Sequence, residues 1–344
     1  MKQNSRFDMK WRVGIAILVG LVGYVVARYY CQQNAGIIFR RNRIMRNKSI
    51  NTAPKPVPPQ RAKFLTNFRK IMRRTNNTGP WGLEFRNFSA YSVKGLQSSM
   101  LERFDIVDNG YLNDDLFWSF GIFDGYGCPR YSNYLEESAS TLVNFLHENW
   151  PKDTKETEKV LENIGSKIIS LDKNIAEEDS NQEICGSSLL VGVVHKSRLI
   201  FINLGNSRAV TVHNGKVVHT EDHTPEKDKE KIEAAGGRVT FSDGVWLLSD
   251  ILPVSRTFGA PPMKALGWMN AVADFYVYDL TRKRPDYIIL ASQGLWRAVT
   301  NEEALEIVNK NLNKKYFGAK QLVDHARTTS EGSMTVMIVK VGKK

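Results

Sequence analysis

The sequence predicts a layered α+β domain in which helices cover the faces of antiparallel sheets. Short apolar runs bounded by turn residues recur along the chain and predict strands at 88–93, 118–123, 188–194, 199–204, 209–213, 287–291 and 335–341. Longer amphipathic stretches predict helices at 131–149, 157–175, 225–235, 301–311 and 319–328. Meanders of strands interrupted by pairs of helices favour a mainly antiparallel architecture.

Turn and capping residues predict several element boundaries. The dipeptide Asn214–Gly215 is favoured in two-residue hairpin turns. Thr224–Pro225 predicts the start of the third helix, and Gly236–Gly237 predicts its end. Thr300 with Glu303 three residues later is typical of a capping box at the start of the fourth helix.

An apolar segment near the amino terminus predicts a membrane anchor. Residues 13–27 contain no charged side chain, and Trp11 and Tyr30 lie at its margins as interfacial aromatic residues do. Fifteen helical residues cover about 22 Å, so a crossing of roughly 30 Å would use residues 11–30. We therefore expect residues 1–30 to form a single-pass anchor.

The alternative interpretation of this segment is a cleaved signal peptide. Val25 and Ala27 have the small side chains that suit a cleavage site. Against secretion, the odd number of widely spaced cysteines, Cys31, Cys128 and Cys185, predicts no disulfide framework. Basic residues are denser after the apolar segment than before it, which favours a domain that faces the cytosol.

Residues 31–80 are expected to form a basic linker that contains prolines, followed by one domain at 81–344. The formal charge of +12 comes largely from bases before residue 75. No base-reading motif accompanies them, so we expect attraction to anionic lipid and no nucleic-acid partner.

Two similar runs in the domain predict one site. The run Phe120–Gly127 is an apolar strand that ends in Asp124 and the flexible Gly125. A carboxylate and a backbone carbonyl at a strand end are ligands that Mg²⁺ or Mn²⁺ prefers, although an isolated Asp-Gly is typical of an ordinary turn. The run 286–296 repeats the pattern with Gln293 in the position of the acid. We interpret the pair as one metal site that has lost part of its ligands.

Eight sequence blocks, in order and spacing, resemble the metal-dependent protein phosphatase family, protein phosphatase 2C. The blocks are Phe120–Gly125, Cys185–Ser188, Asn203–Val210, Asp222–Pro225, Ala234–Val239, Val254–Gly259, Leu290–Trp296 and Met334–Val339. The resemblance covers residues 85–342 and implies an α-β-β-α sandwich of two antiparallel sheets flanked by helix pairs. The anchor, residues 91–95 and residues 316–320 are most similar to the membrane-anchored branch of the endoplasmic reticulum.

The resemblance implies a two-metal centre that hydrolyses phosphoserine and phosphothreonine with a bridging water, using Mg²⁺ or Mn²⁺. Three family carboxylates align with residues that have no carboxylate, namely Leu101, Gln293 and Gly332. Asp124 and the Gly125 carbonyl remain as a remnant metal site. We therefore expect no metal cofactor, or one weakly held Mg²⁺ or Mn²⁺ ion.

Other matched positions differ as well. Tyr126 stands where the family has a histidine that is a candidate general acid, and Gln97 replaces the arginine that grips the substrate phosphate. Glu102 replaces an aspartate behind the ligands. The positions of a third, weaker metal are Glu183, Ala260 and Arg297.

The sequence is compatible with three functions. The first is a catalytically inactive phosphatase-like protein that binds phosphoproteins or signalling partners at a membrane. The second is an active Mn²⁺- or Mg²⁺-dependent serine/threonine phosphatase in which Glu102 or Glu183 substitutes for a lost ligand. The third is an adaptor at the membrane surface that works through the basic segment. His223, Arg208 and Arg256 are expected to have structural roles.

Overall fold

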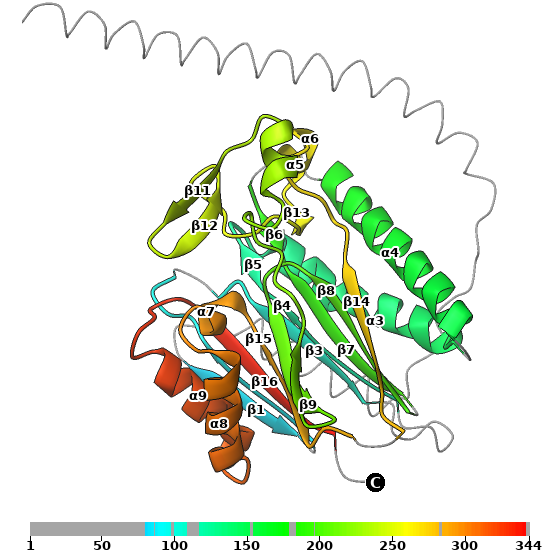
Figure 1. Ribbon diagram of the computed structural model, residues 1–344, viewed down its shortest axis with the longest axis vertical. Helices are drawn as coiled ribbons and strands as arrows, with labels where there is room; N and C mark the ends of the chain where they lie inside the picture. The colour runs from blue at the N-terminus through cyan, green and yellow to red at the C-terminus, as the bar shows by residue number, and fades with distance from the viewer. Residues whose placement is uncertain are drawn as a thin grey trace, which may run out of the picture. The chain divides into compact units, whose positions relative to one another are not determined.

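Two antiparallel sheets pack face to face between helices in the computed structural model of the protein (Figure 1). The structure describes residues 80–85, 87–97, 100–108, 117–151, 154–178, 184–195, 197–281 and 284–341. The expected anchor, and all of the expected linker except Pro80, lie outside these residues. Within the described ranges, no helix is both long enough and apolar enough to cross a membrane.

The first sheet has six strands among the described residues. In spatial order they are β1 (Trp81–Phe85), β2 (Phe88–Val93), β16 (Met334–Lys340), β15 (Tyr287–Ala291), β9 (Arg208–His213) and β10 (Lys216–His219). Every neighbouring pair is antiparallel. Asn214 and Gly215 form the predicted two-residue turn between β9 and β10, with the positive φ values of 51° and 76° that a type I′ turn requires.

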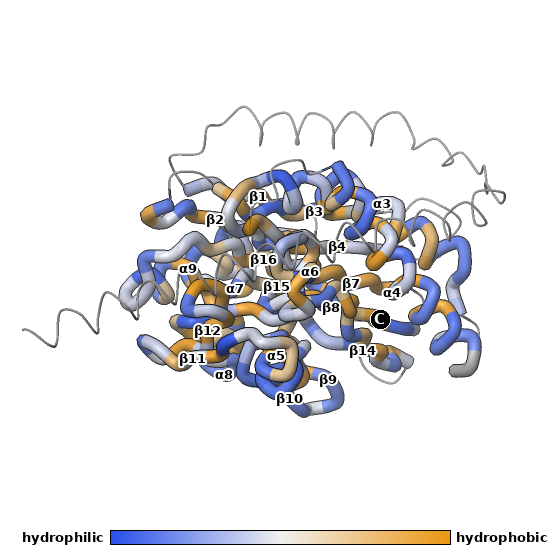
Figure 2. Tube along the Cα trace, turned by 90° about the horizontal axis from the view of Figure 1, so that it is seen from above, coloured by the Kyte–Doolittle hydropathy of each residue, from blue (hydrophilic) through white to orange (hydrophobic). Residues whose placement is uncertain are grey.

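The second sheet carries the acid-terminated strand. Its order is β14 (Asp274–Asp279), β8 (Arg198–Leu204), β7 (Leu189–His195), β4 (Phe117–Phe123) and β3 (Arg103–Asp108). Phe88 of the first sheet contacts the rings of Trp118 and Phe120 of the second, at centroid distances of 6.1 and 6.2 Å. In Figure 2 the central strands such as β15 and β16 are coloured as apolar, which agrees with their burial between the helices and the facing sheet.

A pair of helices covers each sheet. Helices α3 (Arg130–Glu148) and α4 (Thr154–Glu177) pack on the second sheet, and α8 (Asn301–Asn311) and α9 (Ala319–Ala326) pack on the first (Figure 1). Leu135, Leu142 and Leu146 form a fully buried stripe along α3, and each such side chain contributes roughly 1.5–3 kcal/mol through burial. The predicted capping box of α8 is present. The sandwich that the sequence predicted is confirmed.

Shorter elements complete the end of the sandwich that carries the site. They are the small sheet of β5 (Gly125–Tyr126), β6 (Gly186–Ser187) and β13 (Phe258–Gly259), the hairpin of β11 (Val239–Ser242) and β12 (Val245–Leu248), and the short helices α5 (Lys229–Ala234), α6 (Pro261–Ala265) and α7 (Gln293–Trp296). The 3₁₀ helix η1 (Lys315–Gly318) joins α8 to α9 near the other end of β16, where Lys340 lies 3.7 Å from the Phe317 ring centroid.

One predicted helix start is wrong. Residues 225–228 form turns, and α5 begins at Lys229. The N–H groups of Lys227 and Lys229 donate to the carbonyls three residues before them, so this stretch forms turns, and a helical bond over four residues runs from Ile232 to Asp228. The predicted end is correct, since Gly236 has a φ of 82° and Gly237 donates to the Ile232 carbonyl.

Candidate functional site

A cleft of 790 Å³ lies where strands of both sheets end. It is lined by Gln97, Asp124–Tyr126, Asn206, Ile251–Val254, Gln293–Gly294 with Arg297, and Arg327–Ser333. The lining therefore includes most of the site residues that the sequence predicted.

Asp124 connects the two sheets at this cleft. It follows β4, and its Oδ2 accepts a hydrogen bond of 3.1 Å from the backbone N–H of Gln293, the first residue of α7. The Asp124 backbone is held by Ser188, whose N–H donates to the Asp124 carbonyl at 2.9 Å. The structure thus brings together the ends of the two runs that the sequence had paired.

Glu102 lies beside Asp124 at the end of the neighbouring strand. Its side chain is 1% exposed, and neither carboxylate oxygen has a hydrogen-bond partner of normal geometry among the described residues. Burial, together with the charge of Asp124, raises the pKa of Glu102 to about 8, although the nearby Ser333 side chain acts in the opposite direction. Burial also raises the pKa of Asp124 to about 6, against the effect of the Gln293 N–H. The pair therefore binds a proton readily when no cation is present.

Gln97 and Gly332 reach the cleft because the loop after β2 and the turn before β16 are joined by a hydrogen bond. The N–H of Leu96 donates to the Glu331 carbonyl at 3.1 Å. Gly95 has a φ of 61°, and a Cβ at this position would lie 2.2 Å from the same carbonyl oxygen. Only glycine allows this close approach, which places Gln97 next to the segment before β16.

The side chain of Tyr126 is engaged in packing and hydrogen bonding. Its hydroxyl donates to Thr257 Oγ1 at 3.2 Å, and burial raises its pKa further above the ordinary tyrosine value. A Cβ on Gly186 would lie 2.4 Å from the Tyr126 oxygen, so the ring packs directly against the backbone of β6. This hydroxyl is a poor proton donor for a leaving group.

Three other predicted positions do not line the cleft or are not described. Leu101 is half-buried, and its carbonyl accepts a bond of 2.6 Å from Ser132 Oγ. Ala260 is fully buried and donates its N–H to the Cys185 carbonyl. Glu183 lies outside the described residues.

The oxygen donors near the cleft do not fit two divalent ions. Within the described ranges, the carboxylates that line it are Asp124 and Glu331, with Glu102 behind Asp124. No group of three or more histidine, cysteine or acidic side chains in this part of the chain could hold a metal ion. Two dications carry four positive charges and need several carboxylates. Asp124, the Gly125 carbonyl and Glu102 could supply oxygens to one ion.

Arg327 and Glu331 were missed by sequence reasoning. Both lie in the turn between α9 and β16, and the docking of this turn on residues 95–97 brings it to the cleft. No local pattern marks such a contact, because it joins residues more than 200 positions apart in the chain.

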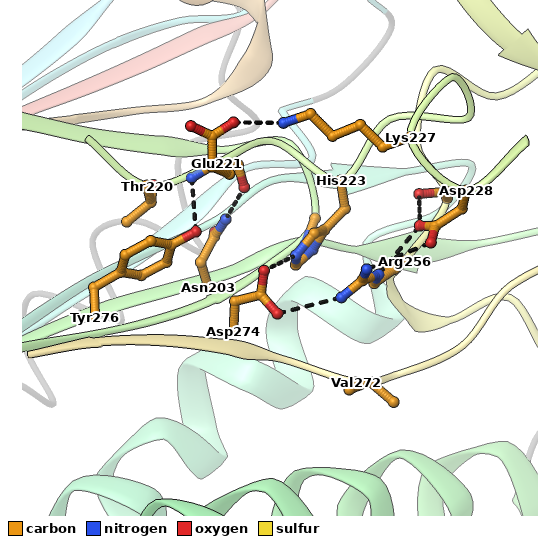
Figure 3. A network of polar contacts seen from close by, with 12 residues as sticks. Asn203, Thr220, Glu221, His223, Lys227, Asp228, Arg256, Val272, Asp274 and Tyr276 are labelled. Atoms are coloured by element: carbon orange, nitrogen blue, oxygen red, sulfur yellow. Dashed lines mark hydrogen bonds and ion pairs between the residues drawn. The ribbon is translucent and has the colours of Figure 1, made fainter. Parts of the chain in front are cut away.

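A polar network supports the segments that carry the cleft (Figure 3). His223 is 3% exposed; its Nδ1 accepts from the Gly205 N–H, and its Nε2 lies 3.1 Å from Asp274 Oδ2. Burial lowers the pKa of His223, with Asp274 opposing, so the ring stays neutral near pH 7. Arg256 bridges Asp274 and Asp228 at 3.2 and 3.1 Å.

These contacts agree with the structural roles expected for His223 and the two arginines. Arg208 makes two hydrogen bonds of 2.9 Å to Asp222, and its guanidinium lies 5.1 Å from the Trp296 ring centroid. Although burial acts in the opposite direction, hydrogen bonds from Ser255 and Arg256 lower the pKa of Asp228.

Comparison with known proteins agrees with this architecture. A Protein phosphatase 2C family model matches residues 87–333. Protein phosphatase 1L of Bos taurus is 30% identical over 270 residues, covering 76% of this chain and 74% of that protein. Probable protein phosphatase 2C 45 of Oryza sativa subsp. japonica is 31% identical over 257 residues, covering 72% of this chain and 85% of that protein.

Solved structures share the fold at lower identity. Serine-threonine phosphatase 2C from Toxoplasma gondii aligns with a TM-score of 0.61 at 22% identity, covering 76% of this chain and 99% of its own. A C. elegans sex determining protein aligns with a TM-score of 0.60 at 18% identity, covering 86% of this chain and 77% of its own. Since the family model spans more than half of the sequence, the chain belongs to the protein phosphatase 2C family.

Proposed function

We propose that this protein is a phosphatase-like binding protein that recognises phosphoproteins, or signalling partners that carry phosphate, without hydrolysing them. One observation carries the proposal: the residue that joins Asp124 across the cleft is Gln293, whose side chain is a neutral amide. The family's chemistry needs carboxylates at this point to hold two metal ions, which activate the attacking water and stabilise the displaced oxygen.

The other cleft residues support the same proposal. Leu101 and Gly332 have no carboxylate to offer, and Gln97 cannot form the charged, two-pronged contact to phosphate that an arginine forms. The Tyr126 hydroxyl is bound to Thr257 and has a raised pKa, so it does not replace a histidine as a proton donor. A phosphate ester in this cleft would be held without being attacked.

A second candidate function rests on Glu102. Its two oxygens lack hydrogen-bond partners among the described residues, and they lie beside Asp124. An Mn²⁺ or Mg²⁺ ion would displace the proton that the pair shares and would satisfy these oxygens. In this alternative the protein is an active serine/threonine phosphatase with an altered metal site.

The protein is proposed to act at a membrane, through residues 11–30, with its domain facing the cytosol. The uncharged run at 13–27 and the basic residues after it support this proposal. The resemblance to the membrane-anchored branch favours the endoplasmic reticulum.

A paired assay on the full-length chain tests the function. Turnover of a phosphothreonine peptide is measured with and without excess Mn²⁺, and binding of the phosphorylated and unphosphorylated peptide is measured in the same buffers. We expect phosphate-dependent binding without Mn²⁺-dependent turnover. Robust Mn²⁺-dependent hydrolysis that is lost in Asp124→Ala would establish the second candidate function instead.

A further inference from the structure

We propose that Arg297 and Arg327 form a metal-independent site for the phosphate monoester of a phosphorylated protein side chain. The inference rests on the proposed function and names the residues and the ligand chemistry that would carry it. Both residues line the cleft beside Asp124.

Arg297 is positioned by the short helix that contacts Asp124. It follows α7 directly, and its N–H donates to the Gln293 carbonyl at 3.1 Å. Residues four apart in a helical turn lie on the same face, so Arg297 shares a face with Gln293. Because Gln293 and Arg297 both line the cleft, this face is directed into it.

Arg327 is positioned by the end of another helix. It follows α9, and its N–H donates to the Val323 carbonyl at 3.0 Å. The next three residues form an ordered turn, since Thr328 donates to His325 and both Thr329 and Ser330 donate to Ala326. The backbone that carries this cation is therefore held before any ligand arrives, which reduces the entropy lost on binding.

The two guanidinium groups are available to a ligand. Both side chains are exposed, and in the described part of the chain neither side chain forms a hydrogen bond or an ion pair. Arg208 and Arg256 differ, because each is bound to aspartate carboxylates. A planar guanidinium can donate two parallel hydrogen bonds to phosphate oxygens, and a phosphate monoester carries about −1.5 to −2 charges at pH 7.

The cleft lining carries positive charge that does not depend on a bound metal ion. Its charged lining residues are two arginines, Asp124 and Glu331, so positive and negative side chains are equal in number. In a two-metal centre, carboxylates attract the metals and the metals attract the phosphate. Here the positive charge that phosphate needs is part of the chain.

An apolar part of the cleft favours a protein ligand over a free phosphate. Residues 251–254 line the cleft, and Ile251 is 58% exposed. Asn206 fixes this segment by donating to the Pro253 carbonyl at 3.1 Å. A peptide with an apolar residue next to the phosphorylated one would cover Ile251, whereas inorganic phosphate would leave it in water.

Fluorescence anisotropy on the full-length chain in EDTA tests the site. The probe is a labelled phosphothreonine peptide with leucine beside the phosphothreonine, and the unphosphorylated peptide is its reference. We expect Arg297→Gln and Arg327→Gln each to weaken binding tenfold or more, and Arg297→Lys to weaken it less. The control Lys310→Gln removes the same charge at an exposed position of α8, outside the cleft lining, and is expected to leave peptide binding unchanged.

Several results would overturn the inference. Binding that requires Mn²⁺ and survives both arginine changes would place the phosphate at Asp124, which refutes the arginine site and leaves the proposed function intact. Absence of phosphate-dependent binding in every buffer would refute both. Arginine-dependent binding to vesicles with phosphorylated inositol lipid, stronger than binding to the peptide, would assign the site to a lipid headgroup instead.

Discussion

Glu102 and Asp124 face each other across the end of the β3–β4 ladder, because Arg103 pairs with Phe123 in an antiparallel register. Side chains at directly opposite positions point to the same side of the sheet, with Cβ atoms about 4.5–5.5 Å apart. Two carboxyl groups at this separation in a buried site do not both ionise without cost. The stability of the protein should therefore depend on the protonation of this pair.

Glu102→Gln should stabilise the protein at alkaline pH. The pKa of Glu102 is about 8 in the folded state and near 4.5 unfolded, so the folded state binds a proton that the unfolded state releases. The stability that this proton provides is complete below pH 4.5 and is lost as pH rises through about 8. At pH 9 in EDTA, the free energy of unfolding of Glu102→Gln should exceed that of the natural chain by up to roughly 5 kcal/mol, since the two pKa values differ by about 3.5 and one pKa unit is worth about 1.4 kcal/mol.

Urea denaturation at pH 5 and at pH 9 measures this difference. Glu162→Gln is a suitable control, because Glu162 is exposed on α4 and lies outside the cleft lining. The interpretation is wrong if Glu102→Gln is less stable than the natural chain at pH 9 in EDTA.

Restoring three carboxylates together should restore tight metal binding. The triple variant Leu101→Glu, Gln293→Asp and Gly332→Asp is expected to gain Mn²⁺ affinity of a hundredfold or more, while each single change has little effect. Space is available at Gly332, where a Cβ would meet only Ser330 Oγ, at 3.6 Å. Equal affinities in the triple variant and the natural chain, measured by calorimetry, would contradict the expectation.

The buried Asp228–Arg256 contact should contribute more to the free energy of unfolding than the exposed Lys231–Asp228 contact does. Asp228 is 6% exposed in its side chain, and its removal leaves Arg256 with half of its partners. We expect Asp228→Ala to lower the free energy of unfolding by roughly 2–4 kcal/mol. Lys231→Ala, which removes a 77% exposed partner of the same carboxylate, should cost about 0.5 kcal/mol or less. Thermal unfolding that ranks the two variants in the reverse order would refute this account.

Deletion of residues 1–30 should release the protein from membranes. In the proposed anchor the apolar run at 13–27 would supply the binding energy, whereas the bases at 40–48 would supply only attraction that salt screens beyond about 10 Å at 0.1 M. Replacing those bases with glutamine should therefore leave the protein in the membrane fraction at high salt. Sedimentation of the truncated chain with membranes at high salt would contradict the single-anchor proposal.

Sequence patterns predicted the layers of the fold and the meeting of its two glycine-containing runs. Buried strands such as β7 and β15 are continuous apolar runs, and the turn at Asn214–Gly215 has residues that tolerate positive φ. Strand β14 was not predicted, because its alternating sequence Asp274–Asp279 lies at a sheet edge with weak burial. Strand β1 is likewise at an edge.

The site was predicted only in part, for a different physical reason. The sequence identified Asp124 and Gln293, which follow apolar strands, but the pairing of Glu102 with Asp124 depends on strand register. The approach of Arg327 depends on a loop contact between Leu96 and Glu331. The start of α5 was misplaced because residues 224–229 close turns over three residues, which the pattern Thr224–Pro225 does not distinguish from a helix start.

Calorimetric titration of the full-length natural chain with Mn²⁺ tests the central claim most directly. The oxygen donors around Asp124 predict at most one weakly bound ion, because Gln293 and Gly332 add no carboxylate to Asp124 and Glu102. Asp124→Ala should abolish the heat of that single ion. Two tightly bound Mn²⁺ ions per chain, both lost in Asp124→Ala, would contradict the account and show that a complete two-metal centre assembles in this cleft.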